Sequence, residues 1–313
     1  MFAYLDQYRL ADMRAMLRNQ RAPHHRTRAS LAGKTVVIAG STSGVGLAAA
    51  VEVARYGGRL VLLARNQEKG RAVRSLLERD FGAEVALFLA DFARLAQVHR
   101  LADELLDRVE RIDVLINSAG VHCTRRALTD EGHELAFCVN HLAPFVLTHR
   151  LLPKLEEGGA ARVLQVNSQG HRFGGLDLGD LDWRRRYYIG LRAYGASKTA
   201  QLLSVWTLAD RLEGSGVTIN AMHPGEVRTG IGSNNGPLYR WYQRRILGRW
   251  LKDVRISGES LHYLAAAPEL DGISGRYYNR THPEKPAPHA LDRAVGRGVW
   301  ERTLALTGLT DDG

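Results

Sequence analysis

Two side chains in the middle of the chain have the types and the spacing of a proton donor and its partner. Tyr194 and Lys198 are four residues apart in a segment predicted to be helical, so both project from the same face. An ammonium group beside a phenol favours the phenolate, and we expect it to lower the phenol pKa from about 10 toward the working pH. Such a tyrosine can give and take a proton at an alcohol or carbonyl oxygen.

A third polar side chain, Ser168, follows the end of a predicted strand. Residues 162–166 form a short apolar run typical of a buried strand, and Ser168 comes two residues later. Ligands of open α/β sheets bind beyond the carboxyl ends of the strands, so Ser168 is expected beside a ligand. A hydroxyl at this place is best explained by a developing alkoxide that needs a hydrogen bond.

The stretch from Lys34 to Ala50 predicts the fold that must position these groups. Residues 35–39 are β-branched and apolar, as in a strand buried on both faces of a parallel sheet. Gly40, Gly44 and Gly46 follow with the spacing GxxxGxG and lead into small helix-forming residues. Glycine permits a positive φ and a close backbone approach, and the N–H groups of the new helix favour a pyrophosphate.

The residue after the second predicted strand bears on which dinucleotide is bound. Folds that prefer NAD have an acid there that accepts from the ribose 2′-OH. This chain has Ala64 followed by Arg65. A guanidinium can bind a 2′-phosphate through charge-assisted hydrogen bonds, so the sequence favours NADP(H). The alternative is that Arg65 is a solvated charge at a strand end.

Strands and helices alternate along the rest of the chain. This pattern predicts one Rossmann-like domain over 31–313, a doubly wound parallel sheet of about seven strands with helices on both faces. The predicted strands are 35–39, 59–64, 84–89, 114–117, 162–166, 217–222 and 275–279. The predicted helices include 67–81, 95–109, 129–152, 257–266 and 291–306.

Several motifs in a fixed order resemble the short-chain dehydrogenase/reductase family from Lys34 to about Leu309. Within that family the chain is similar to the retinol-dehydrogenase-like branch, in Leu63-Ala64-Arg65-Asn66, in the run from Val139 to Phe145, in the long insertion between Ser168 and Tyr194, and in Gly275-Arg276-Tyr277-Tyr278. Ala39 and Ser118 depart from the family pattern, which usually has Thr and Asn there.

The resemblance implies a role for each matching residue. Tyr194 would be the acid and base, Lys198 would lower its pKa and hold the nicotinamide ribose, Ser168 would bind the reacting oxygen, and Asn140 would hold a relay water. The implied cofactor-binding residues are Gly40, Ser41, Ser43, Gly44, Val45, Gly46, Arg65, Asn66, Asp91, Phe92, Asn117, Ala119, Gly120, Tyr194, Lys198, Pro224, Gly225, Val227 and Thr229.

The substrate pocket is predicted from the segments that follow the later strands. We expect it to contain His171, Trp183, Glu226 and the basic, aromatic helix 237–251. That helix is interpreted as a substrate lid, with docking on an anionic membrane or an acidic carrier protein as the alternative.

Composition and charge limit the other classes of function. The 313 residues are 45% hydrophobic and 24% charged, which is typical of a soluble globular enzyme. The net charge of +10 comes without a nucleic-acid motif, so nucleic acid is not an expected partner. Cys123 and Cys138 form neither a disulfide framework nor a metal motif, and they favour the cytoplasm.

The first thirty residues are predicted to form an amphipathic helical extension and a linker. Residues 1–30 contain no apolar run long enough to span a membrane. Their helix is expected to pack on the domain or on a second copy in a homo-oligomer, and attachment to a membrane surface is the alternative.

The sequence therefore predicts an NADP(H)-dependent oxidoreductase that interconverts a hydroxyl and a carbonyl group on a small, fairly apolar substrate. An NADP-dependent reductase of an activated C=C bond and a non-catalytic cofactor-sensing protein are the alternatives. Ser168 argues against the first alternative, and the presence of both Tyr194 and Lys198 argues against the second.

Overall fold

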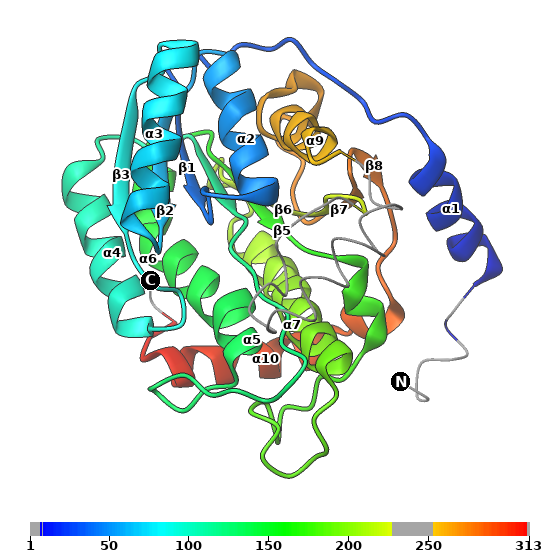
Figure 1. Cartoon of the computed structure of the whole chain (residues 1–313). Coiled ribbons are helices and arrows are strands. Elements are labelled where there is room, and N and C mark those ends of the chain that lie inside the picture. The colour runs from blue at the N-terminus through cyan, green and yellow to red at the C-terminus, as the bar shows by residue number, and fades with distance from the viewer. Residues whose placement is uncertain (1–6, 8, 227–252, 312–313) are drawn as a thin grey trace.

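Short aliphatic runs form the strands of one central sheet. The computed structural model describes residues 7, 9–226 and 253–311, and its eight strands lie in the order β3-β2-β1-β4-β5-β6-β7-β8 (Figure 1). The strands are β1 (Thr35–Ala39), β2 (Arg59–Ala64), β3 (Val85–Leu89), β4 (Val114–Asn117), β5 (Arg162–Val166), β6 (Thr218–His223), β7 (Tyr277–Asn279) and β8 (His282–Pro283). The first seven strands are parallel, which confirms the predicted Rossmann-like sheet. The two-residue β8 adds an antiparallel edge that carries no apolar pattern in the sequence.

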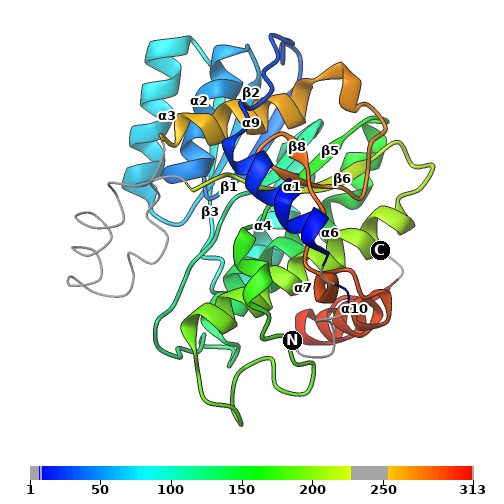
Figure 2. The ribbon, with the colours of Figure 1, turned by 90° about the vertical axis from the view of Figure 1, so that its right-hand side faces the viewer.

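Helices cover both faces of the sheet, as expected. The helices α2 (Gly44–Arg55), α3 (Gln67–Phe81) and α9 (Arg255–Ala266) form one layer, and α4 (Leu95–Arg108), α6 (Ala143–Glu157), α7 (Gly190–Arg211) and α10 (Arg293–Thr307) form the other. Strand residues alternate between the two layers: Val36 and Ile38 pack with α2, whereas Val37 and Ala39 face the opposite core. Figure 2 shows the two layers on either side of the strands.

The predicted helix over 129–152 is wrong at its beginning. Residues 129–134 form a turn, closed by a bridge between Leu128 and Glu134, with Gly132 at a φ of 87°. Helical structure begins with the single turn α5 (Leu135–Phe137), continues as a π-helical segment at Cys138–Leu142, and then becomes α6. The apolar spacing of the sequence extends through the turn, so it did not reveal where the helix starts.

This helical stretch is also the most membrane-like part of the described chain. Leu135–Glu157 is the one described helix that is long and apolar enough to span a bilayer, but 89% of its apolar window is buried inside the protein. It is thus a core helix of the fold.

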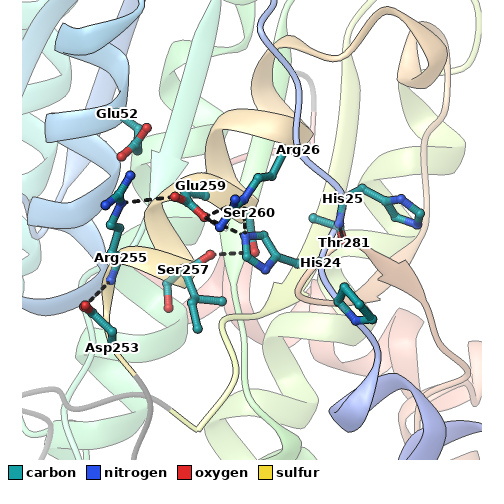
Figure 3. A network of polar contacts seen from close by, with 12 residues as sticks. His24, His25, Arg26, Glu52, Asp253, Arg255, Ser257, Glu259, Ser260 and Thr281 are labelled. Carbon is teal, nitrogen blue, oxygen red and sulfur yellow. Dashed lines mark hydrogen bonds and ion pairs between the residues drawn. The ribbon is translucent and has the colours of Figure 1, made fainter.

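The N-terminal extension packs on the body of the domain. Its helix α1 (Leu10–Arg21) lies at the outer edge of the sheet beside β7 and β8 (Figure 1). The following linker contacts α9, where His24 and Arg26 both pair with the partly buried carboxylate of Glu259. Figure 3 shows Glu259 between Arg26 and Arg255 of α9. These ion pairs thus attach the linker to the side of α9 that faces α2.

Helices α2 and α9 touch through backbone, and this contact yields a stability prediction. A Cβ atom on Gly258 of α9 would lie 2.5 Å from the carbonyl oxygen of Ala48, so Gly258→Ala should lower the free energy of unfolding by about 1–3 kcal/mol. Gly296→Ala in α10 is the matched control, because its Cβ would meet nothing nearer than 3.7 Å. The control should be neutral or stabilising by about 0.5–1 kcal/mol. Urea denaturation measures both, and equal effects would contradict the packing argument.

Candidate active site

A cavity of about 460 Å³ opens at the carboxyl ends of the central strands. Its lining comes from the loops after β1, β2, β3, β4, β5 and β6 and from α7. The lining residues are Gly40, Thr42, Ser43, Gly44, Val45, Leu63, Ala64, Arg65, Ala90, Asp91, Phe92, Ala93, Ser118, Ala119, Gly120, Val121, Leu135, Val139, Val166, Asn167, Ser168, Tyr194, Lys198, His223, Pro224, Gly225 and Glu226. Most of the predicted site residues thus surround one cavity.

The glycine turn forms one wall of the cavity because its backbone packs where no side chain would fit. Gly40 has a φ of 78°, and a Cβ there would lie 2.7 Å from the backbone of Ala119. A Cβ on Gly46 would lie 2.3 Å from the carbonyl oxygen of Gly40. Ser43 makes no side-chain cap hydrogen bond to α2, so the first N–H groups of this helix lack that partner. A pyrophosphate fits such a helix N-terminus.

Ser168 and Tyr194 meet at the opposite end of the cavity. Their hydroxyl groups share a hydrogen bond, and the ring of Tyr194 lies against the backbone of Gly170. Burial raises the pKa of Tyr194, while the hydrogen bond with Ser168 opposes the rise. The expected downward shift of the phenol pKa is wrong for this arrangement, because burial disfavours the phenolate more than its partner favours it.

Lys198 lies one helical turn beyond Tyr194 and is buried. Its Nζ donates to the carbonyl oxygen of Val166 at 2.9 Å and to Oε1 of Gln201 at 3.4 Å. Nζ is 6.0 Å from the centre of the Tyr194 ring, so the two side chains do share a face as predicted. Burial lowers the pKa of Lys198 to about 7, because the ammonium loses its hydration.

Asn140 supports the site from behind the cavity wall. It lies in the π-helical segment, where its Oδ1 accepts from the backbone N–H of Val121 at 2.8 Å and its Nδ2 donates to Ser197 at 2.9 Å. Its carbonyl oxygen accepts from Nε2 of Gln201 at 3.1 Å. The backbone carbonyl of Asn140 is thus linked to the side chain of Gln201.

Gln201 is the polar residue that sequence reasoning missed. Its side chain joins Lys198 to Asn140, and it also contacts Asn167 at 2.7 Å and Gln165 at 3.2 Å. The available signal was its position three residues after Lys198, on the buried face of α7. A glutamine in a core helix is nevertheless too common a feature to identify such a contact.

The other end of the cavity carries polar groups suited to an adenosine. Arg65 is exposed after β2, and Asp91 accepts from the backbone N–H of Ala93 at 3.0 Å through one carboxylate oxygen. Both line the cavity together with Phe92. Among the described residues no group of three or more His, Cys, Asp or Glu side chains could hold a metal ion.

Some residues predicted to bind the cofactor instead shape the surrounding backbone. Ser41 donates to the carbonyl oxygen of Leu63, Asn66 caps α3 by accepting from Lys69, and Asn117 donates to Thr148. None of these three lines the cavity among the described residues. Ser41 and Asn117 are buried, whereas Asn66 is exposed and caps the neighbouring helix.

The expected substrate pocket is partly wrong. His171 is fully buried and held by Ser168 and Ala287, and Trp183 packs against Arg186 and Tyr188, so neither lines the cavity. Glu226, Pro224 and Gly225 do line it. Val227, Thr229 and the predicted lid at 237–251 lie outside the described residues.

The structure adds an apolar wall that the sequence did not indicate. Val121, Leu135 and Val139 are among the residues that line the cavity. His223 lines it as well, and burial lowers the pKa of this imidazole to about 3, so it is neutral. These four residues give the cavity a part of its lining that carries no charge.

Comparison with known proteins agrees with this geometry. The family model for the short chain dehydrogenase matches residues 34–237. The chain belongs to this family. Human retinol dehydrogenase 13 is 37% identical over 288 residues, which cover 90% of this chain and 87% of that protein. The Streptomyces sp. (strain C5) protein DnrU, provisionally named a daunorubicin C-13 ketoreductase, is 36% identical over 289 residues, 92% of this chain and 98% of its own.

A solved structure whose sequence is similarly related to this chain has the same fold. The crystal structure of an uncharacterized protein from Mycobacterium paratuberculosis superposes with a TM-score of 0.73 at 32% identity, and the match covers 90% of this chain and 96% of that one. The resemblance to the retinol-dehydrogenase-like branch of the family is thus confirmed. As a short chain dehydrogenase, the chain is an oxidoreductase of hydroxyl and carbonyl groups that uses a nicotinamide dinucleotide.

The burial of Lys198 predicts how stability depends on pH. Its pKa falls from a usual value of 10.5 to about 7 on folding. Between these values the unfolded chain binds a proton that the folded protein does not, so the free energy of unfolding rises with pH across this window. Lys198→Met removes the buried ammonium and should therefore be more stable than the parent at pH 7, by roughly 1–3 kcal/mol.

The gain should shrink toward pH 10, because the folded lysine is then neutral and the unfolded lysine has begun to lose its proton. Urea denaturation at pH 7 and pH 10 measures the change, and Lys69→Met, at an exposed position of α3, is the control. A gain of equal size at both pH values would contradict the origin in Lys198 ionisation.

Proposed function

We propose that the protein is an NADP(H)-dependent oxidoreductase that interconverts a hydroxyl and a carbonyl group on a small, fairly apolar organic substrate. The observation that supports this most is the meeting of Ser168, Tyr194 and Lys198 in one cavity that also contains the glycine turn. A bound nicotinamide would supply or accept the hydride. The protein groups would bind the cofactor, orient the substrate and move the proton.

Tyr194 is the residue that we infer to exchange the proton with the substrate oxygen. During carbonyl reduction its hydroxyl would donate a proton while Ser168 hydrogen-bonds the same oxygen. During alcohol oxidation the phenolate would take that proton back. The raised pKa of Tyr194 keeps its hydroxyl protonated before reduction, and Lys198, whose pKa is about 7, can carry the charge that stabilises the phenolate.

The cofactor would lie along the carboxyl ends of the strands. Gly40 and Gly44 would cradle the pyrophosphate at the N-terminus of α2, and Asp91 would accept from the adenine amino group. Arg65 would bind the 2′-phosphate that distinguishes NADP from NAD. Pro224 and Gly225, with Val227 and Thr229, are proposed to enclose the nicotinamide.

The substrate is proposed to be apolar because part of the cavity lining is apolar. Val121, Leu135 and Val139 form a wall that offers no charge to a ligand. The two relatives compared above are named for action on retinol and at C-13 of daunorubicin. We also infer a reducing, cytoplasmic location, because the two cysteines of the sequence, Cys123 and Cys138, do not make a disulfide framework.

The first test removes the proposed acid. Tyr194→Phe keeps the ring and its packing but removes the hydroxyl, so turnover should fall by at least ~10²-fold, the lower range for general acid–base catalysis. Absorbance of NADPH, followed with a panel of aldehydes, ketones and alcohols, measures turnover, and fluorescence titration measures NADPH affinity. The affinity should survive. Near-normal turnover of the Phe variant would sink the assignment.

The second test concerns the cofactor. Arg65→Ala should weaken NADPH binding by roughly 1.5–3 kcal/mol, as expected for a charge-assisted hydrogen bond, and leave NADH binding nearly unchanged. Arg65 is exposed, so the substitution should not perturb the fold. The dissociation constants for NADPH and NADH are measured side by side. Equal losses for the two cofactors would remove the proposed preference for NADP(H).

A further inference from the structure

Helix α1 turns its apolar side away from the protein. Leu10, Met13 and Leu17 are spaced as neighbours on one helical face, and their exposed fractions are 68%, 47% and 50%. The only buried residue of this helix is polar, Asn19. A surface helix of a globular protein normally has the opposite orientation, with its apolar stripe against the core.

Polar contacts hold the helix in this orientation. Asn19 donates to the carbonyl oxygen of Pro283 at 3.2 Å, and Asp12 pairs with Lys285 at 3.1 Å. The buried guanidinium of Arg280 donates to the carbonyl oxygens of Asn19 and Ala22 at the C-terminal end of the helix. Three separate contacts therefore fix the apolar stripe outward, so its exposure follows from how the helix is docked.

Arginines run beside the exposed stripe. Arg14, Arg18 and Arg21 have the same three- and four-residue spacing, are exposed, and occupy the face next to Leu10 and Leu17. Asp12 is the only acidic residue of α1, and its carboxylate is engaged by Lys285. The outward half of the helix is thus apolar on one side and cationic on the other.

We propose that α1 docks this protein on an anionic lipid surface, with Leu10, Met13 and Leu17 inserted at the headgroup boundary and Arg14, Arg18 and Arg21 against the lipid phosphates. A helix with an apolar stripe beside a basic face is suited to lying in the plane of a membrane interface. The negative surface attracts each nearby arginine, and the apolar side chains leave water. This inference does not depend on the proposed function.

Charge favours lipid over a second copy of the chain as the occupant. A symmetric pairing of two α1 helices, stripe against stripe, would bring the three arginines of each copy close to those of the other. Such like-charge contacts oppose association. An anionic bilayer instead has an apolar interior and a negatively charged surface. It can therefore contact both the apolar and the cationic side of the outward face.

The test is co-sedimentation of the full chain with vesicles. We expect binding to phosphatidylcholine vesicles that contain phosphatidylserine, weak binding to phosphatidylcholine alone, and loss of binding at high salt. The triple variant Arg14→Gln, Arg18→Gln, Arg21→Gln should lower the affinity roughly 100-fold, since each arginine contributes about fivefold. The variant Leu10→Gln, Met13→Gln, Leu17→Gln should also lose binding.

A matched control comes from exposed apolar residues elsewhere. Tyr187 lies in the insertion before α7 and Leu191 in the first turn of α7, and they are 88% and 53% exposed. Both arginines and aspartates occur in this part of the sequence. Tyr187→Gln with Leu191→Gln should leave vesicle binding unchanged, and thermal unfolding should be the same for all variants. The proposal would be overturned if the α1 substitutions left vesicle binding unchanged, or if the protein bound neutral vesicles equally well. It would also be overturned if the protein were a dimer that the Leu10, Met13 and Leu17 substitutions dissociate.

Discussion

The close approach of three backbone segments at the glycine turn is the constraint on which the rest of the structure depends. The end of β1, the start of α2 and the loop after β4 meet where Gly40 touches Ala119 and Gly46 touches the carbonyl oxygen of Gly40. No side chain fits between them, so α2 starts directly at the end of β1. The first N–H groups of α2 therefore face the cavity. The central sheet then places α7, which is far away in the chain, at the same carboxyl edge as the glycine turn.

Burial governs the chemistry at the other end of the cavity. Low polarity lowers the pKa of Lys198 and raises that of Tyr194, so each group is moved toward its neutral form. Burying both side chains costs free energy, because the charged form of each loses its hydration. The cost is offset by the contacts of Gln201 and Asn140, which position Lys198 and the wall at Val121.

The helix at the edge of the sheet packs differently from the helices at its centre. Around α2, α7 and α9, apolar residues face inward and the packing is between backbones and aliphatic side chains. At α1 the inward contacts are polar, and they converge on β8 and the buried Arg280. Apolar side chains are thus buried around the active site, whereas those of α1 are exposed where we propose that the protein binds a membrane.

The sequence by itself determined the strands, the alternation of helices and the glycine turn, because these depend on local periodicity and on glycine's conformational freedom. It also determined that Tyr194 and Lys198 share a face and that Ser168 closely follows a strand. Only the tertiary structure decided what surrounds them: Gln201 at Lys198, an apolar wall at Leu135, and His171 outside the cavity. It also decided the sign of the Tyr194 pKa shift and the outward stripe of α1. These properties depend on contacts between residues far apart in the chain, and local spacing does not encode how much water such contacts exclude.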